Sequence, residues 1–372
     1  MNCHKIRPER NNKNSRPAFA ALLFFCVCFI APSSANNSRE FALHSQFDHF
    51  SYSGAMAVFG LANDWRGTFR SGKDGILDQR FVFSALYNDI EIGYSHILYH
   101  QYEFPNDLAR GFYYYNNNVK LDSPFTIDTY LKAQSYSGRG LTLAYPFQFS
   151  LSLLAENLNF SFKPRLNWFH LDYLVWGEFN GELTYLDNKN WGGTIDLDYR
   201  YSKDFVLRRP LENDPSGELY SFDLEFKTQW SSGEFNYSGR NLYALIDWPK
   251  VPHSFGRVTT EGPLALYARE GFDKDFSANP PALHYAELKQ NLYSDQWQLL
   301  MDARHTSIRD FYRLGFRYLG DNVSFSVRQD VQHNSVELAL SYQGNSLWLQ
   351  SQTWDVSQSQ QLTAGYSFSY SF

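Results

Sequence analysis

The chain has 372 residues and a formal net charge of −6, with 18% aromatic and 19% charged residues. Its mean hydropathy of −0.45 argues against a bundle of transmembrane helices, each of which needs about 20 predominantly apolar residues. A chain that is polar on average yet rich in Tyr, Phe and Trp is typical of strands with one wet face and one apolar face.

The first 35 residues have the pattern of a secretory signal peptide. Five basic residues precede an apolar run over 18–31, and small residues at Ser33 and Ala35 predict cleavage after Ala35. The apolar run is shorter than the roughly 20 residues of a membrane anchor, which favours the signal peptide. The sequence therefore predicts an exported chain, residues 36–372, that forms a single domain.

Export of residues 36–372 also bounds the chemistry. Cys3, Cys26 and Cys28 all precede the predicted cleavage site, so we expect no disulfide, no cysteine metal site and no cofactor. Residues 1–35 contain five of the 33 basic residues and one of the 39 acidic ones, which leaves a net charge of −10. That balance argues against nucleic acid as a partner.

Strict alternation of apolar and polar residues marks the strands. Four segments show it most clearly, namely 191–202, 220–230, 312–318 and 336–343. Successive side chains of a strand point to opposite faces, so each segment has one apolar and one polar surface.

The last segment alternates in the same way. Its apolar side includes Phe368, Tyr370 and Phe372, and its other side carries Ser, Thr and Gly. This pattern resembles the C-terminal signature of Gram-negative outer-membrane β-barrels, in which a terminal aromatic residue belongs to the assembly signal. The resemblance implies the cell outer membrane as location, and outer-membrane lipid, lipopolysaccharide and the barrel-assembly machinery as partners.

The fold class expected is all-β, a transmembrane antiparallel up-and-down barrel of about 18 strands, with 16 as the main alternative. Short turns are expected at 88–89, 137–138, 163–165, 187–190, 231–233, 294–295, 320–321 and 344–345. Long connectors near 64–78, 101–124, 204–218 and 247–282 then all fall on the extracellular side, as the rule for such barrels requires. For 247–282, two alternatives stay open: a constriction inside the barrel or an extra hairpin.

Charged residues on the polar faces are the candidate site. Alternation points these acidic residues inward: Glu182, Asp196, Asp198, Asp223 and Glu225. It also points these arginines inward: Arg304, Arg313, Arg317 and Arg328. The two groups form either an acidic and a basic wall that tune selectivity, or luminal salt bridges with partners such as Arg200, Lys227 and Asp302.

A porin-like channel for passive diffusion of small polar or charged solutes is the function expected. The alternative is a structural or polysaccharide-export barrel. A hydrolase is less expected, because the sequence has no Gly-x-Ser-x-Gly motif and neighbouring Ser95 and His96 point to opposite faces. We expect no enzyme activity and no metal site, and Asp273 and Asp275 are interpreted as a solvated loop face. The sequence leaves the oligomeric state open.

Overall fold

The computed structural model describes residues 41–58, 68–117, 119, 123–153, 156–187, 190–204, 210–211, 215–259, 265–266, 269–272, 275–293 and 296–372. The predicted signal peptide, its cleavage site and Asp273 lie outside these residues.

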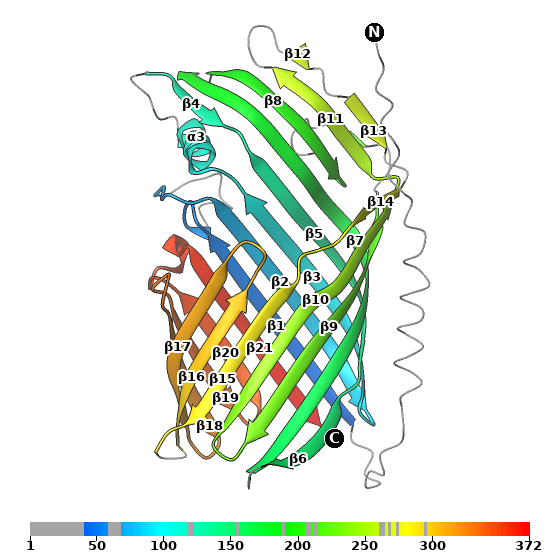
Figure 1. Cartoon of the computed structure of the whole chain (residues 1–372), viewed down its shortest axis with the longest axis vertical. Coiled ribbons are helices and arrows are strands. Elements are labelled where there is room, and N and C mark those ends of the chain that lie inside the picture. The colour runs from blue at the N-terminus through cyan, green and yellow to red at the C-terminus, as the bar shows by residue number, and fades with distance from the viewer. Residues whose placement is uncertain are drawn as a thin grey trace. The chain divides into compact units, whose positions relative to one another are not determined.

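Fourteen strands of the described chain close into one antiparallel ring (Figure 1). In ring order they are β1 (Phe41–Ser53), β2 (Asp74–Tyr87), β3 (Ile90–Glu103), β5 (Leu131–Ala144), β7 (Glu156–Asp187), β9 (Gly217–Trp230), β10 (Gly233–Pro249), β15 (Leu283–Asn291), β16 (Trp297–His305), β17 (Asp310–Leu319), β18 (Val323–Asp330), β19 (Val336–Tyr342), β20 (Asn345–Ser351) and β21 (Gln361–Ser371). The last strand pairs with the first, from Ala42 opposite Ser371 to Tyr52 opposite Gln361. Closure leaves no unpaired edge in the ring, which is what a sheet needs to cross a membrane.

Further strands extend the sheet at both ends of the ring. At one end, β6 (Phe147–Leu153) pairs with the first residues of β7. At the other end are β4 (Phe125–Asp128), β8 (Asn190–Tyr201), β11 (Pro252–Thr259), β12 (Ala265–Leu266), β13 (Arg269–Phe272) and β14 (Asp275–Ala278). The described helices are α3 (Asn106–Asn117) and the short 3₁₀ helix η1 (Val356–Gln358). Among the described residues, no helix has the length and hydropathy to cross a membrane.

The expected strand number was wrong, because 18 segments of the sequence become 14 ring strands. Three predicted segments, 155–163, 166–176 and 178–187, form the single 32-residue strand β7. The segments 125–136 and 139–153 become β4, β5 and β6, which all pair with β7 and contribute only β5 to the ring. The segment 191–203 becomes β8, which lies outside the ring. The alternative count of 16 is wrong for the same reasons.

Pro164 explains the first of these errors. The turn predicted at 163–165 lies inside β7, where Pro164 stands opposite Leu224 of β9. The carbonyl of Pro164 accepts a hydrogen bond from Tyr145, beside the break between β5 and β6 at Pro146. In an antiparallel ladder the amide of a residue points to the same side as its carbonyl, so the amide that proline lacks would face this break. The strand therefore continues through Pro164 at little cost in hydrogen bonds.

Two other predicted turns also have a structural explanation. Ser137 and Gly138 lie within β5 at a register shift, where β7 carries one extra residue, so this is a β-bulge and not a turn. The turn at 187–190 does join two strands, β7 and β8, but it lies at the opposite end of the barrel from the one predicted.

The remaining described connectors lie at the ends where they were predicted, and the turn expected at 294–295 lies outside the described residues. Short turns at Asn88-Asp89 and Gln343-Gly344 have positive φ at both residues, which matches the twist of a tight hairpin. They lie at the same end as the strand termini, where the amide of Phe372 donates to the carbonyl of Phe41. The long connectors lie at the other end. In this class of barrel the termini and short turns face the periplasm, so the long connectors are extracellular.

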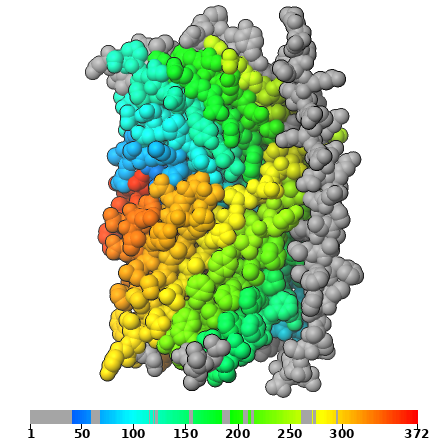
Figure 2. Space-filling view, in the orientation of Figure 1, coloured from blue at the N-terminus to red at the C-terminus, as the bar shows by residue number. Residues whose placement is uncertain are grey.

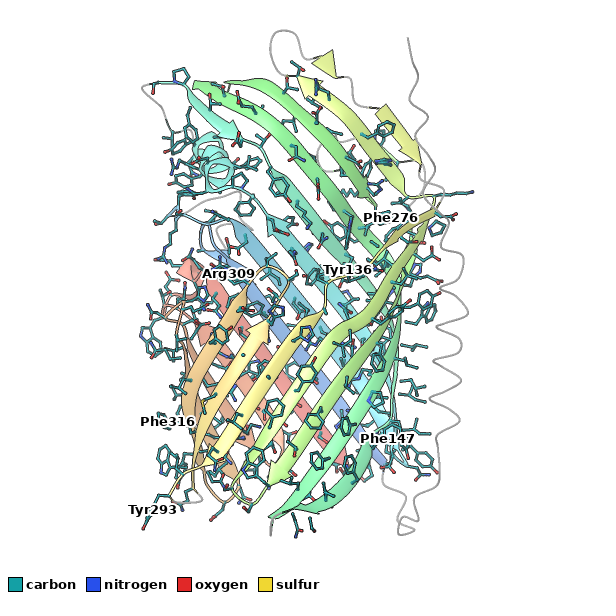
Figure 3. The ribbon with its side chains drawn as sticks, in the orientation of Figure 1. Tyr136, Phe147, Phe276, Tyr293, Arg309 and Phe316 are labelled. Atoms are coloured by element: carbon teal, nitrogen blue, oxygen red, sulfur yellow. The ribbon has the colours of Figure 1, made fainter. Side chains whose placement is uncertain are left out.

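The outer surface of the ring is apolar. On β17, Tyr312, Leu314, Phe316 and Tyr318 are all exposed, and Phe316 projects away from the barrel with half of its surface exposed (Figure 3). Trp297 and Tyr342 lie next to periplasmic turns and are exposed too. Phe368, Tyr370 and Phe372 continue this exposed aromatic surface at the end of β21. An apolar exterior with interfacial aromatics makes the chain a transmembrane barrel of the outer-membrane type.

The wall is not of even height. β16 and β17 end well below the extracellular end of β5, β7 and β8, and the step is visible on the surface (Figure 2). The extracellular part beyond the step has its own buried apolar cluster, which includes Leu108 of α3 and Ile127 of β4. Segment 250–282 contributes β11 to β14 to this part, where β11 pairs with β8, β12 and β13. The described strands of this segment correspond to the extra hairpin, while Val251, Phe276 and Ala278 pack in an apolar cluster with residues of the ring strands.

Candidate functional site in the barrel lumen

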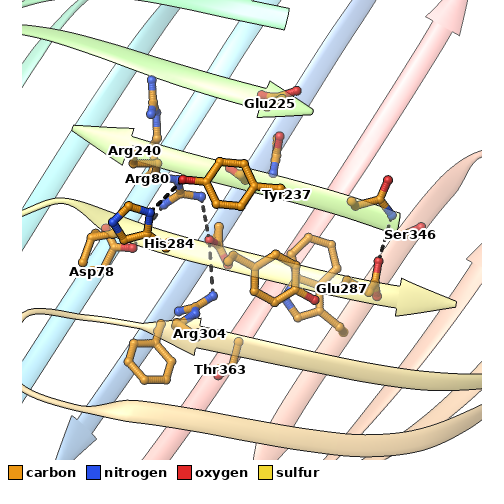
Figure 4. Close-up of a pocket in the computed structure, with 18 of the residues that line it drawn as sticks. Asp78, Arg80, Glu225, Tyr237, Arg240, His284, Glu287, Arg304, Ser346 and Thr363 are labelled. Carbon is orange, nitrogen blue, oxygen red and sulfur yellow. Dashed lines mark hydrogen bonds and ion pairs between the residues drawn. The ribbon is translucent and has the colours of Figure 1, made fainter. Parts of the chain in front are cut away.

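A cavity of about 590 Å³ occupies the lumen (Figure 4). It extends from Lys227 and Ser346, near the periplasmic turns, to Phe50, Ile76 and Leu283, which belong to an apolar cluster. Ten Lys and Arg residues and six Asp and Glu residues line the cavity. The cavity wall is therefore basic, although the chain as a whole is acidic.

Ion pairs cross the lumen between strands that are not neighbours in the ring. Arg240 on β10 contacts Asp48 of β1 at 2.9 Å and Asp78 of β2 at 3.1 Å. Arg80 on β2 contacts Asp223 of β9 at 2.7 Å, and both bond to Asn167 of β7. These contacts join opposite walls of the barrel, so they hold the ring together across its interior.

Arg240 lies at a bulge in β10. The register with β9 shifts between Gly239 and Tyr243, and Asn241 has a positive φ of 54°. Asn241 donates its amide to Asp223 at 2.9 Å and its side chain to Tyr136 of β5 at 3.3 Å. Bulges of this kind change the direction in which a side chain points, and here the bulge brings Asn241 into the network.

Arg313 and Arg328 form a second network on β15 to β19. Arg313 contacts Asp302 at 2.6 Å and also contacts Glu337. Arg328 contacts Glu337 at 2.8 Å and also contacts Glu287. Strand register explains the pairing, because Asp302 lies opposite Arg313 and Glu337 lies opposite Arg328. The side chains of Asp302 and Glu337 are only 1% and 3% exposed, so these pairs are shielded from water.

Two arginines of the cavity wall are bound differently. Arg317 donates to the hydroxyl of Ser324 at 2.7 and 3.0 Å, and no carboxylate of the described chain is within ion-pair distance of it. Arg304 lies 3.9 Å from Asp48 and 4.2 Å above the centre of the Phe50 ring. Its charge is therefore only weakly neutralised by a carboxylate.

The predicted site residues fall into two places. Six of them line the cavity: Asp223, Glu225, Arg304, Arg313, Arg317 and Arg328. Glu182, Asp196 and Asp198 do not, because they lie on the extracellular extension of β7 and on β8, outside the ring. The strand register still puts Glu182 and Asp196 on the side of the sheet that faces the lumen, so the predicted face is correct. Their position along the barrel axis differs from the prediction, because they lie beyond the cavity on the extracellular side. Their role in selectivity stays a prediction.

Acidic and basic residues are interleaved in the cavity and do not form two separate walls. Glu225 contacts Arg165 at 3.0 Å, and Asp302, Glu287 and Glu337 stand among the arginines of β16 to β18. Three residues of the ion-pair network were not predicted from sequence, Asp48, Arg80 and Arg240, although each occupies an alternate position within its strand. The period-two pattern of β1, β2 and β10 is the signal that points these side chains inward.

The extracellular acids are largely paired as well. Arg257 of β11 donates to both oxygens of Asp196, at 2.7 and 2.9 Å, and these hydrogen bonds lower the pKa of that carboxyl. Asp198 contacts Arg200 at 2.7 Å and His253 at 2.9 Å. Among the described residues, no three His, Cys, Asp or Glu side chains are grouped to hold a metal ion.

An apolar cluster lies across the lumen on the extracellular side of the cavity. It is formed by buried residues of nine ring strands, together with Val251: Phe50, Tyr52, Ile76, Tyr99, Tyr136, Phe169, Leu171, Leu174, Leu219, Ala244, Ile246, Trp248, Leu283 and Phe311. The ring of Phe311 on β17 packs edge-on against Phe50 and Tyr52 of β1, at centroid distances of 4.9 and 5.3 Å. We call this group the luminal apolar cluster. The sequence contained one signal for it, the run from Tyr243 to Ile246, which is apolar on both faces.

Comparisons with known proteins give only remote likenesses. No protein-family model matches the chain, and no curated protein matches it. A mutant of the TodX monoaromatic hydrocarbon channel is 10% identical, with a TM-score of 0.38 and 91% of each chain covered. A FadL homologue of Pseudomonas aeruginosa is 10% identical, with a TM-score of 0.34 and 90% and 88% of the two chains covered. The outer membrane protease OmpT of Escherichia coli is 8% identical, with a TM-score of 0.19 and 91% and 100% covered. Scores this low support no inference about function.

Proposed function

We propose that the protein is an outer-membrane channel that conducts small polar or charged solutes passively, through the basic cavity, when the luminal apolar cluster opens. The observation that carries the proposal is that the basic cavity and the luminal apolar cluster follow one another along the lumen. The charged cavity lies on the periplasmic side, and the luminal apolar cluster lies on the extracellular side. Hydrophobic constrictions gate channels by excluding water.

The size and charge of the cavity define the solutes. A volume of about 590 Å³ lies within the range of sites for small molecules. Ten basic and six acidic residues in the wall favour anions. Arg317 contributes most to this preference, because its charge has no carboxylate partner in the described chain.

Conductance of the purified barrel in planar bilayers tests the proposal. We expect the wild type to be closed for most of the time and Phe311→Ala to conduct, because this change removes the ring that joins β17 to β1. Trp248→Ala, at a second fully buried position of the cluster, serves as an independent opening variant. Phe316→Ala is the matched control, since Phe316 lies on the same strand but faces outward.

Heat-modifiable migration on gels would show that each variant is folded. Folded Phe311→Ala and Trp248→Ala barrels that both stay silent would overturn the channel. Equal conductance of the wild type and all three variants would show instead that the cluster is not the constriction.

One observation favours a second candidate, a structural barrel with a solid interior. The ion pairs Arg240–Asp48 and Arg80–Asp223 tie opposite walls together, and such contacts stabilise a ring whether or not it conducts. Silent but folded opening variants would favour this candidate. Enzyme activity and polysaccharide export have no comparable observation in their favour among the described residues.

A further inference from the structure

Three basic residues stand side by side on the outer, membrane-facing surface of the barrel. Arg139 of β5 lies directly opposite His96 of β3 on one side and His170 of β7 on the other. These strands are neighbours in the wall (Figure 1), and directly opposed residues have Cβ atoms about 5 Å apart. All three side chains are exposed. We call them the basic ledge.

No ion pair of the described chain involves the ledge. Two carboxylates lie beside it, Glu218 of β9 and Asp172 of β7, and the latter accepts a hydrogen bond from Ser137. No hydrogen bond or ion pair connects Arg139, His96 or His170 to another described side chain. On the β9 side, Glu218 lies opposite His170, where it bonds to the hydroxyl of Tyr220 and limits the ledge to three strands. On the β2 side, Phe81 lies opposite His96. An unpaired arginine flanked by two imidazoles is a strong donor set for an oxyanion.

An apolar row lies immediately below the ledge on the same three strands. Tyr94, Leu141 and Trp168 are opposite one another in the register, and each is exposed. Each stands two residues from one member of the ledge, about 7 Å along its strand. The row is nearer to the periplasmic end, because β3 runs outward from the turn at Asn88-Asp89. The ledge therefore marks the extracellular edge of the apolar belt on this side of the barrel.

We propose that the basic ledge binds the phosphate of an outer-leaflet glycolipid, whose acyl chains lie over Tyr94, Leu141 and Trp168. Charge and geometry both fit this occupant. The guanidinium of Arg139 can hold a phosphate through two parallel hydrogen bonds, and the imidazoles can donate on either side. The apolar row stands where the hydrocarbon of such a lipid begins. A free anion would use the ledge but would leave the apolar row without a function.

Native mass spectrometry of the mature barrel with phosphorylated lipid A tests the assignment. We expect the wild type to retain lipid A and the triple variant His96→Gln, Arg139→Gln, His170→Gln to bind it about tenfold more weakly. Arg110→Gln is the control, because Arg110 is a half-buried arginine of α3 that contacts Asp107 and lies away from the ledge. Heat-modifiable migration confirms folding of each variant, and Arg139→Gln alone serves if the triple variant does not fold.

Three results would overturn the proposal. Equal binding by the wild type and the folded ledge variant would show that the lipid binds elsewhere. Equal binding of lipid A and its fully dephosphorylated form would remove the role of the phosphate. Displacement of lipid A by inorganic phosphate at the same concentration would assign the ledge to a free anion and not to a lipid.

Discussion

Replacement of Arg313 by methionine should destabilise the barrel strongly. Arg313 lies between Asp302 and Glu337, whose side chains are almost fully buried. Methionine has a similar length but no charge, so the change leaves both carboxylates without their closest partner. A buried charge that loses its partner is costly, since it can be neither hydrated nor compensated.

The magnitude follows from what remains near the two acids. Loss of one member of a buried ion pair costs about 3–5 kcal/mol. Arg328 still contacts Glu337 at 2.8 Å and stands 3.6 Å from Asp302, so it compensates part of the loss. We therefore expect a decrease of about 3 kcal/mol in the free energy of unfolding, at the lower end of that range.

Urea unfolding of the mature barrel in lipid vesicles, followed by tryptophan fluorescence, measures this change. Arg317→Met is the matched control on the same strand and faces the same cavity. Arg317 bonds to the hydroxyls of Ser324 and Ser341, and Ser341 also bonds to Ser346. We expect this control to lose only about 1 kcal/mol, the usual net value of a hydrogen bond.

Two results would refute the reasoning about Arg313. One is a loss no larger for Arg313→Met than for Arg317→Met. The other comes from a triple variant, Arg313→Met with Asp302→Asn and Glu337→Gln, in which the orphaned charges are removed together. If unpaired carboxylates cause the loss, the triple variant should be more stable than the single variant. A triple variant no more stable than Arg313→Met would refute the reasoning.

Three further predictions concern selectivity, assembly and export. In the conducting Phe311→Ala background, Arg317→Ala should move the reversal potential toward cations in a salt gradient, and Arg313→Ala combined with Asp302→Asn should move it much less, because that change removes a neutral ion pair; equal shifts would contradict this. Deletion of Phe372 should lower the amount of heat-modifiable barrel in the outer membrane, since its amide bonds to Phe41 and the two rings lie 5.5 Å apart; an unchanged amount would count against the assembly signal. N-terminal sequencing of the outer-membrane fraction should find Asn36 first, whereas intact Met1 or a lipid-modified cysteine would reject the signal peptide.

The strands that alternate strictly could be predicted from sequence, and so could their inward faces. The segments that became β9, β17, β19 and β21 were placed correctly, because a polar and an apolar face are local properties of a strand. The short turn at Asn88-Asp89 was predictable for the same reason, since only a few residue types adopt positive φ readily. The long connectors could be assigned to one end because strand direction alternates along the chain.

The sequence by itself determined that the chain has one apolar and one polar surface per strand, and hence an outer-membrane barrel with charges inside. Only the tertiary structure decided how many strands close the ring, because Pro164 fits a strand only where the neighbouring strand breaks, and because Ser137-Gly138 continues as a strand beside a bulge in β7. It also decided which charges meet, since Arg240 and Asp78 lie far apart in the sequence and pair only once the ring is closed. The luminal apolar cluster arises in the same way, from inward residues of nine strands that no local pattern connects.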